Sequence, residues 1–177
     1  IQEFNNAIPI DPDDADAYNN RGNAYYDLGQ WQRAIEDYDK DIQLDSDDAM
    51  AYYNRGVAYY NMGQWQRAIE DYNKAIQLDP GYALAYYNRG NAYHDLGQYQ
   101  LAIEDFDKAI QLDPGNALPY NNRGIACYKL SQWQQAIEDH DKSIELEPDY
   151  TWVYDSHGVI YEHLGQYAIA IEDYDKA

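Results

Sequence analysis

The side chains that most often carry out catalysis are few in this chain, and their spacing brings no set of them together. Four histidines, His94, His140, His157 and His163, and one cysteine, Cys127, are scattered over its second half. His157 and His163 are six residues apart, so a helix would place them on different faces. A single cysteine offers neither an intrachain disulfide nor a cysteine metal cluster. We therefore predict no catalytic site, no enzyme activity and no cofactor.

Acidic clusters are the remaining candidates for a metal site. Two short runs of this kind are Asp11, Asp13 and Asp14, and Asp45, Asp47 and Asp48. Both lack the central glycine and the later bidentate glutamate of a dedicated calcium loop. We interpret them as solvated turns and predict no metal site.

The overall charge limits the class of partner. The 177 residues carry a formal net charge of -20, which argues against nucleic acid and against anionic membrane surfaces and permits neutral or basic partners. No apolar run approaches the ~18 residues of a membrane span. The single cysteine is typical of a reducing compartment, so we expect a cytoplasmic protein. The 21 tyrosines recur at fixed places, which is unlike a disordered chain.

A period of 34 residues organises the whole sequence. It is marked by five glycines, Gly22, Gly56, Gly90, Gly124 and Gly158. A fixed period in this range predicts helical hairpins that stack on one another. In the second full repeat we expect a first helix, helix A, over 50–62 and a second, helix B, over 65–78. Gly63 separates the two helices, and Pro80 ends the unit.

The repeat resembles the tetratricopeptide repeat, whose pattern is W-x2-L-G-x2-Y, A-x3-F and P. The matching residues in one repeat are Tyr52, Arg55, Gly56, Tyr59, Ala68, Tyr72 and Pro80. The resemblance covers the whole chain. It implies an all-α fold, an α-solenoid of stacked antiparallel helix pairs in a right-handed superhelix, and a role as a protein-interaction scaffold.

Two kinds of position depart from the family pattern. An arginine replaces leucine before the glycine in four repeats, and His157 does so in the fifth. Asp41 and Ser143 stand where other repeats have alanine, so we predict weak places in the stack there. An ion pair between Asp41 and Arg55 is one possible compensation.

The repeat boundaries predict one array over 1–177. A partial repeat at 1–14 is followed by full repeats at 15–48, 49–82, 83–116 and 117–150 and by a truncated repeat at 151–177. Both ends pass through a helix, and no polar capping element is visible. We therefore expect a fragment of a longer array with exposed apolar ends. Such ends could stack between molecules, and the array could also be the recognition arm of a larger enzyme.

The resemblance also indicates where a partner would bind, because helices A line the concave face of such arrays. The inspected positions lie six, three and two residues before each glycine and one, four and five after it. Repeats 15–48 and 49–82 agree at 24 of 34 positions, and four of their ten differences fall on these positions. The variation fits a changing binding surface or neutral drift at exposed positions.

One inspected position keeps the same residue through four repeats. It holds Asn20, Asn54, Asn88 and Asn122, and then Ser156. An asparagine amide has a donor and an acceptor and can pair with the backbone of any extended peptide. The alternative is that these amides serve the packing or hydration of the repeat itself.

Aromatic and apolar residues complete the expected face. These candidates are Asn23, Asn91, Tyr26, Tyr53, Tyr60, Tyr87, Tyr128, Met50, Leu84, Leu118 and Trp152. Tyrosine and tryptophan are favoured anchors at interfaces, although several rings could instead pack between adjacent helices A. We predict an extended, neutral-to-basic peptide of about a dozen residues as the partner. The positions that form the carboxylate clamp of chaperone-binding family members hold no basic residue here, so an acidic chaperone C-terminus is not expected.

Overall fold

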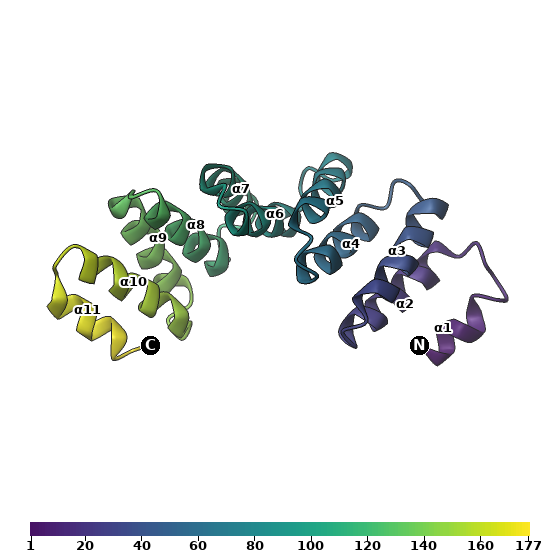
Figure 1. Cartoon of the computed structure of the whole chain (residues 1–177), viewed down its shortest axis with the longest axis horizontal. Coiled ribbons are helices and arrows are strands. Elements are labelled where there is room, and N and C mark those ends of the chain that lie inside the picture. Colours follow the sequence, from purple (N-terminus) through teal and green to yellow (C-terminus); the bar gives the residue numbers. More distant parts are fainter. The chain divides into compact units, whose positions relative to one another are not determined.

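Every regular element in the described part of the chain is an α-helix, as predicted. The computed structural model describes the backbone of residues 1–177 and every side chain except that of Ala7. The eleven described helices fall into two compact units, residues 1–92 and residues 93–177, with the division inside α6. Figure 1 labels the helices in chain order.

The first unit contains the helices of the first two full repeats. Its elements are α1 (Gln2–Ala7), α2 (Ala15–Asp27), α3 (Trp31–Leu44), α4 (Ala49–Asn61), α5 (Trp65–Leu78) and most of α6 (Ala83–Asp95). The bounds of α4 and α5 confirm the predicted helices A and B to within a residue. Here α2 packs on α3 and α4 packs on α5, so each of these helices A packs on its own helix B, and α4 also packs on α3 of the preceding repeat.

The second unit follows the same order of helices. Its elements are α7 (Tyr99–Leu112), α8 (Ala117–Lys129), α9 (Trp133–Leu146), α10 (Thr151–His163) and α11 (Tyr167–Tyr174). Here α8 packs on α7 and α9, and α10 packs on α9 and α11. Within each unit, antiparallel helix pairs are therefore stacked in sequence.

Polar residues define the helix ends. The side chains of Asp14, Asp48 and Asn116 accept backbone N–H groups in the first turns of α2, α4 and α8, at 3.1, 2.7 and 3.0 Å. Such caps satisfy donors that a helix cannot pair internally. Between helices A and B the chain turns at a residue with positive φ, which is glycine in four repeats, at +70 to +73°, and Ser131, at +59°, in the fourth full repeat. These turns keep the two helices of a pair antiparallel.

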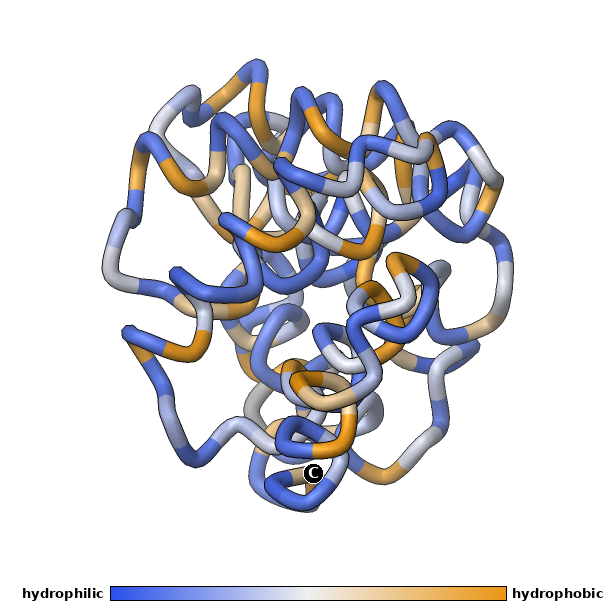
Figure 2. The backbone as a smooth tube through the Cα atoms, turned by 90° about the vertical axis from the view of Figure 1, so that its left-hand side faces the viewer, coloured by the Kyte–Doolittle hydropathy of each residue, from blue (hydrophilic) through white to orange (hydrophobic). Residues whose placement is uncertain are grey.

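Close approach of the paired helices explains the repeated glycine. Tyr38 and Tyr72 are buried in helices B of the first unit. A Cβ added at Gly22 or Gly56 would lie 2.6 or 2.8 Å from the Cε1 atom of the facing tyrosine ring. Apolar and polar segments alternate along the chain in Figure 2, as expected for helices that bury one side. The aromatic ring of helix B therefore fills the space left by the absent glycine side chain.

The arginine that departs from the family pattern joins three helices. In the first unit Arg55 of α4 donates two hydrogen bonds to Asp71 of α5, at 2.8 and 2.6 Å, and one to Asp39 of α3, at 2.5 Å. Arg123 of the second unit bonds to Asp139 and Asp107 in the same way. In α4 and in α8 the arginine thus ties helix A to its own helix B and to the helix B before it.

The compensating pair considered for Asp41 does not form. Arg55 is directed to Asp71 and Asp39, and Asp41 instead accepts a hydrogen bond from Asn19 Nδ2 at 2.5 Å. Asp41 is buried, and its Oδ1 has no hydrogen-bond partner among the described residues. Burial raises the pKa of its carboxyl to about 6, although the bond from Asn19 acts in the opposite direction.

Ser143, the second predicted weak place, is different. It is buried, and its hydroxyl donates to the carbonyl oxygen of Ala117 at 3.1 Å. A buried polar group with a partner costs little. The expectation of a weak place therefore fits Asp41 better than Ser143.

Candidate functional site

The asparagines expected to form a ladder connect consecutive helices A in the first unit. Asn54 Nδ2 donates to Asn19 Oδ1 at 3.1 Å, and Asn88 Nδ2 donates to the hydroxyl of Tyr53 at 2.9 Å. These bonds belong to the packing of the repeat itself, which is one of the two interpretations of the asparagines that the sequence left open. The Oδ1 atom of each amide accepts no hydrogen bond from the side chains and backbone that the structure describes. An acceptor therefore remains for a ligand at both positions.

The other asparagines differ from these two. Asn20 is exposed, and Asn122 of the second unit accepts a hydrogen bond from Asn121 Nδ2 at 3.0 Å. Asn23 accepts from the Tyr38 hydroxyl at 2.7 Å and donates to Asn19 Oδ1 at 3.2 Å. Both ends of the Asn23 amide are thus used inside the protein. Asn91, in α6, is half-buried.

Several tyrosines of the candidate face also contribute to packing. The Tyr53 ring lies 4.8 Å from that of Tyr82, between centroids, and burial raises the pKa of its phenol. The Tyr26 hydroxyl accepts a hydrogen bond from Asn61 of the next helix A at 2.8 Å. Tyr60 and Tyr87 are half-buried. These rings present a partly exposed aromatic surface and support the stack at the same time.

An apolar side chain stands six residues before the repeat glycine in the last four repeats, whereas the first full repeat has Asp16 there. Met50 and Leu84 of the first unit are 53% and 48% exposed, and Trp152 of the second unit is 73% exposed. Leu118 at the same position of α8 is half-buried. Large apolar side chains therefore remain exposed at this repeat position, in a chain with a mean hydropathy of -0.83.

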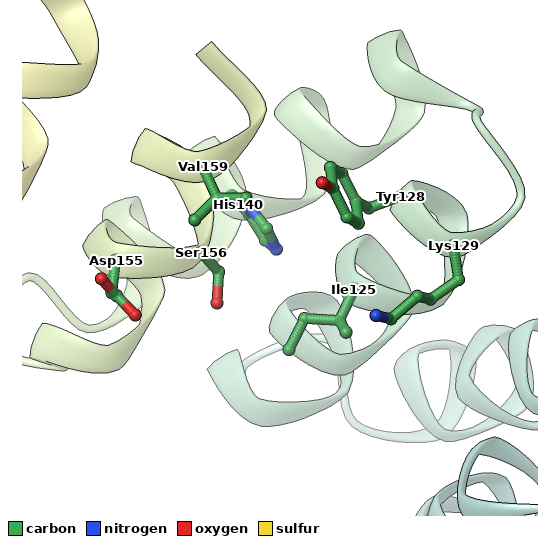
Figure 3. Close-up of a pocket in the computed structure, with 7 residues that line it drawn as sticks. All are labelled: Ile125, Tyr128, Lys129, His140, Asp155, Ser156 and Val159. Carbon is green, nitrogen blue, oxygen red and sulfur yellow. The ribbon is translucent and has the colours of Figure 1, made fainter. Parts of the chain in front are cut away.

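A pocket of about 170 Å³ opens in the second unit, between α8 and α10. Six of its seven residues occupy inspected positions of helices A, and the seventh comes from α9; they are Ile125, Tyr128, Lys129, Asp155, Ser156, Val159 and His140. Figure 3 shows the His140 ring at the centre, with Ser156 and Val159 on one side and Ile125 and Tyr128 on the other. The pocket is therefore part of the candidate face.

His140 is the polar group at the base of this pocket. Its side chain is 1% exposed, and neither ring nitrogen makes a hydrogen bond with good geometry in the described part of the chain. Burial, with a smaller effect of His157 in the same direction, lowers the pKa of the imidazole to about 4, and the backbone of Asn121 opposes the change. The ring is thus neutral near pH 7, with one donor and one acceptor nitrogen.

The remaining reactive side chains do not assemble. Cys127 is buried, and burial raises the pKa of its thiol to about 11, which makes it a poor nucleophile. No group of three or more histidine, cysteine or acidic residues among those described could hold a metal ion. Nor does any described helix have the length and apolar character needed to cross a bilayer.

The comparisons with protein families decide the identity of the repeat. The model described as tetratricopeptide repeat matches residues 49–82, 83–116 and 117–150. Two further models of this repeat match residues 1–29 and 22–63 and residues 153–177. The chain belongs to the tetratricopeptide repeat family. As such it is a helical scaffold of a type that serves protein–protein interaction and is typically non-catalytic.

Solved structures agree with this tetratricopeptide repeat fold. A crystal structure of MamA is 29% identical, with a TM-score of 0.82 over 88% of this chain and 91% of that one. YrrB, described as a TPR protein with an unusual peptide-binding site, is 25% identical, with a TM-score of 0.81 over 98% and 89% of the two chains. PilF of Pseudomonas aeruginosa, 24% identical, shares the fold with a TM-score of 0.83 over 92% of this chain and 74% of its own. A comparison with curated proteins gave no match.

Two features of this tetratricopeptide repeat protein were not recognised from the sequence. The pocket residues Lys129, Asp155 and Val159 stand at inspected positions but were not selected. The sequence signal for the pocket was His140 itself. A histidine is smaller than the tyrosines Tyr38 and Tyr72 at the same repeat position, so it leaves unfilled space between the helices. The second feature is the Asn19–Asp41 bond, which could have been found by comparing repeats.

Proposed function

We propose that this tetratricopeptide repeat protein binds an extended, neutral-to-basic peptide along helices A. The observation that carries the proposal is the apolar side chain at this repeat position within each unit, here called the apolar row. It is Met50 and Leu84 in the first unit and Leu118 and Trp152 in the second, and three of the four are about half exposed or more. Apolar side chains at a spacing of one repeat offer anchor points for alternate side chains of a peptide. Burial of each would stabilise the complex by about 1–2 kcal/mol.

Polar groups beside this row support the same function. The free Oδ1 atoms of Asn54 and Asn88 can accept hydrogen bonds from backbone N–H groups of the peptide, whatever its sequence. The net charge of -20 favours a neutral or basic peptide and speeds its association at low salt. The peptide-binding site in the description of YrrB adds support from a related fold.

A library of random 12-residue peptides tests this proposal. We expect an enriched consensus, and at least tenfold weaker binding of an enriched peptide to the double variant Met50→Ser/Leu84→Ser. Both side chains are exposed, so circular dichroism and thermal unfolding should change little. The matched control is Gln66→Ser/Gln100→Ser on the exposed side of α5 and α7. Equal affinity of both double variants and the parent would reject the row as a binding surface.

The asparagines are tested separately, because they also bond within the protein. We expect Asn54→Ala/Asn88→Ala to weaken binding of the same peptide by about tenfold with little loss of helicity. Since each change removes an inter-repeat hydrogen bond, a lower melting temperature by itself would not count. An unchanged affinity in the folded variant would remove the ladder from the proposal and leave the apolar row.

A second candidate function is self-association by stacking of repeats. It is favoured by α11, whose side chains Tyr167 and Ile171 are 64% and 59% exposed. Such a helix face can pack against another repeat unit. Light scattering over a dilution series distinguishes the two functions, since stacking alone makes the particle size depend on concentration. A size that stays constant with dilution would argue against stacking.

A further inference from the structure

The pocket at His140 lies where the fourth full repeat differs from the first at two facing positions, one on helix B and one on helix A. The tyrosines at this position in the first unit, Tyr38 and Tyr72, are buried, and the hydroxyl of Tyr38 reaches Asn23 on helix A. In the fourth full repeat the residue is His140, and Ile125 replaces the asparagine. The imidazole still lies against its glycine, with Cδ2 2.5 Å from a Cβ built at Gly124. Because it is shorter than a phenol, it leaves the outer part of the space open.

The walls and base of this pocket differ in polarity. Ile125, Val159 and the ring of Tyr128 supply apolar and aromatic surface. At the base, neither ring nitrogen of the buried His140 makes a hydrogen bond of good geometry with the residues that the structure describes. An unpaired polar group in such a place is costly until a ligand or a water pairs with it. A suitable ligand therefore combines an apolar body with a polar tip.

We propose that this pocket binds the side chain of a tyrosine in the peptide partner, with the phenol hydroxyl hydrogen-bonded to His140. The assignment rests on the proposed function, since the six helix A residues of the pocket lie at positions of the peptide-binding face. It adds a specificity site to that face. The partner's phenol occupies the space that the protein's own phenol fills in the first unit.

Size and charge select tyrosine over other side chains. The volume of about 170 Å³ is close to the roughly 150 Å³ of an engineered cavity that holds benzene. A phenylalanine would fill the space but leave the imidazole unpaired. Lys129 and Asp155 lie on opposite sides of the labelled residues in Figure 3. The rim of the pocket therefore carries charges of both signs and favours neither an acidic nor a basic ligand side chain. The phenol hydroxyl can donate to the imidazole or accept from it.

Nuclear magnetic resonance with two small probes tests the assignment. N-acetyltyrosine amide and N-acetylphenylalanine amide differ only in the hydroxyl. We expect the tyrosine probe to shift the imidazole ¹⁵N signals of His140 and the methyl signals of Ile125 and Val159, and to bind about tenfold more tightly than the phenylalanine probe, or better. Equal binding of the two probes, or no shift with either as for a pocket that holds only water, would overturn the assignment.

Two variants at His140 complete the test. His140→Tyr, which copies Tyr38 and Tyr72, should place the protein's own phenol in the pocket and abolish the shifts at Ile125 and Val159. His140→Phe, which copies Phe106, should keep the fold and remove the preference for the hydroxyl. Folded variants that bind the tyrosine probe as the parent does would contradict the role of His140.

The same peptide library separates this assignment from the proposed function. Peptides that bind to helices A without enrichment of tyrosine would reject the pocket assignment alone. A tyrosine probe that shifts His140 while no peptide binds would support the pocket and reject the longer groove. Tyrosine enriched at one register, and lost in His140→Tyr, is the result expected if both hold.

Discussion

At the scale of single residues, the polar side chains of the helix pairs replace apolar packing with directed contacts. Arg55 stands where the family has leucine, and it bonds to acidic residues on two helices. Its partner Asp71 is buried, and burial raises the pKa of that carboxyl even though Arg55 acts to lower it. A buried ion pair of this kind adds little net stability but is costly to break on one side. The arginines therefore fix the register of neighbouring helices.

A second residue-scale feature is visible when the repeats are compared. Where Asn19 and Asn121 stand three residues before the glycine, helix B carries a polar residue, Asp41 or Ser143. Where Tyr53 stands there, helix B carries Ala75. Large aromatic rings are thus paired with alanine, and the smaller amide is paired with a polar side chain. The Asn19–Asp41 bond at 2.5 Å is the contact behind this correlation in the first repeat.

Replacing Asp41 with serine should stabilise the protein near neutral pH. The folded-state pKa of about 6 lies above the ordinary value of 3.8, so the ionised carboxylate opposes folding above pH 6 and this cost fades as the pH falls toward 4. Allowing for the lost bond from Asn19, we expect Asp41→Ser to gain about 1–2 kcal/mol at pH 7.5 and much less at pH 5. Urea unfolding at the two pH values measures the difference.

The matched control for this prediction is Asp149→Ser in the exposed turn between α9 and α10, because Asp149 is not among the charges that act on Asp41. It removes the same charge without touching a buried carboxylate, and so it should show a small effect that varies little with pH. A gain for Asp41→Ser that is equal at pH 5 and pH 7.5 would contradict the assigned cause.

At the scale of helices, the turn between helices A and B needs a left-handed residue. Gly29, Gly63, Gly97 and Gly165 supply it, and Ser131 adopts the same conformation at a φ of +59°. A residue with a Cβ atom pays a conformational cost of roughly 1–2 kcal/mol there. The turn before α9 is therefore the most strained of the five.

Replacing Ser131 with glycine should stabilise the second unit. The relief of strain is partly offset by the greater freedom of glycine in the unfolded chain, so we expect a net gain of about 0.5–1 kcal/mol. Thermal unfolding followed by circular dichroism measures it. The reverse change at the equivalent turn, Gly63→Ser, should destabilise the protein by a similar amount, and a loss of stability in Ser131→Gly would contradict this account.

The helices themselves could be predicted from sequence, but the partners of their polar side chains could not. The bounds of α4 and α5 followed from the 34-residue period and from the breaks at Gly63 and Pro80. These are local signals. The bonds of Asn54 to Asn19 and of Arg55 to Asp39 depend on distances between helices of different repeats, which periodicity alone does not give. For the same reason the pocket at His140 was not predicted from the sequence.

At the scale of the whole molecule, acidic residues dominate the charge. The chain has 32 acidic and 12 basic residues, and most of the basic ones are already paired with acidic groups or with aromatic rings. The unbalanced carboxylates repel one another in the folded state. Screening by salt shortens the range of this repulsion from about 30 Å at 0.01 M to about 8 Å at 0.15 M.

Moderate salt should therefore raise the thermal stability. We expect a rise of about 2–4 °C in the melting temperature between 0.01 and 0.15 M sodium chloride, which corresponds to about 1 kcal/mol for a protein of this size. Differential scanning calorimetry gives the value. A melting temperature that stays constant or falls over this range would show that ion pairs outweigh the repulsion.

Mapping where an enriched peptide binds on the protein is the most direct test of peptide binding along helices A. Methyl and amide signals are followed by nuclear magnetic resonance while the peptide is added. We predict that the changes concentrate on helices A, at Met50, Leu84, Leu118 and Trp152 and at the amides of Asn54 and Asn88. Changes confined to the exposed side of helices B, for example at Glu70 and Glu104, would contradict it and would place the partner on the opposite face.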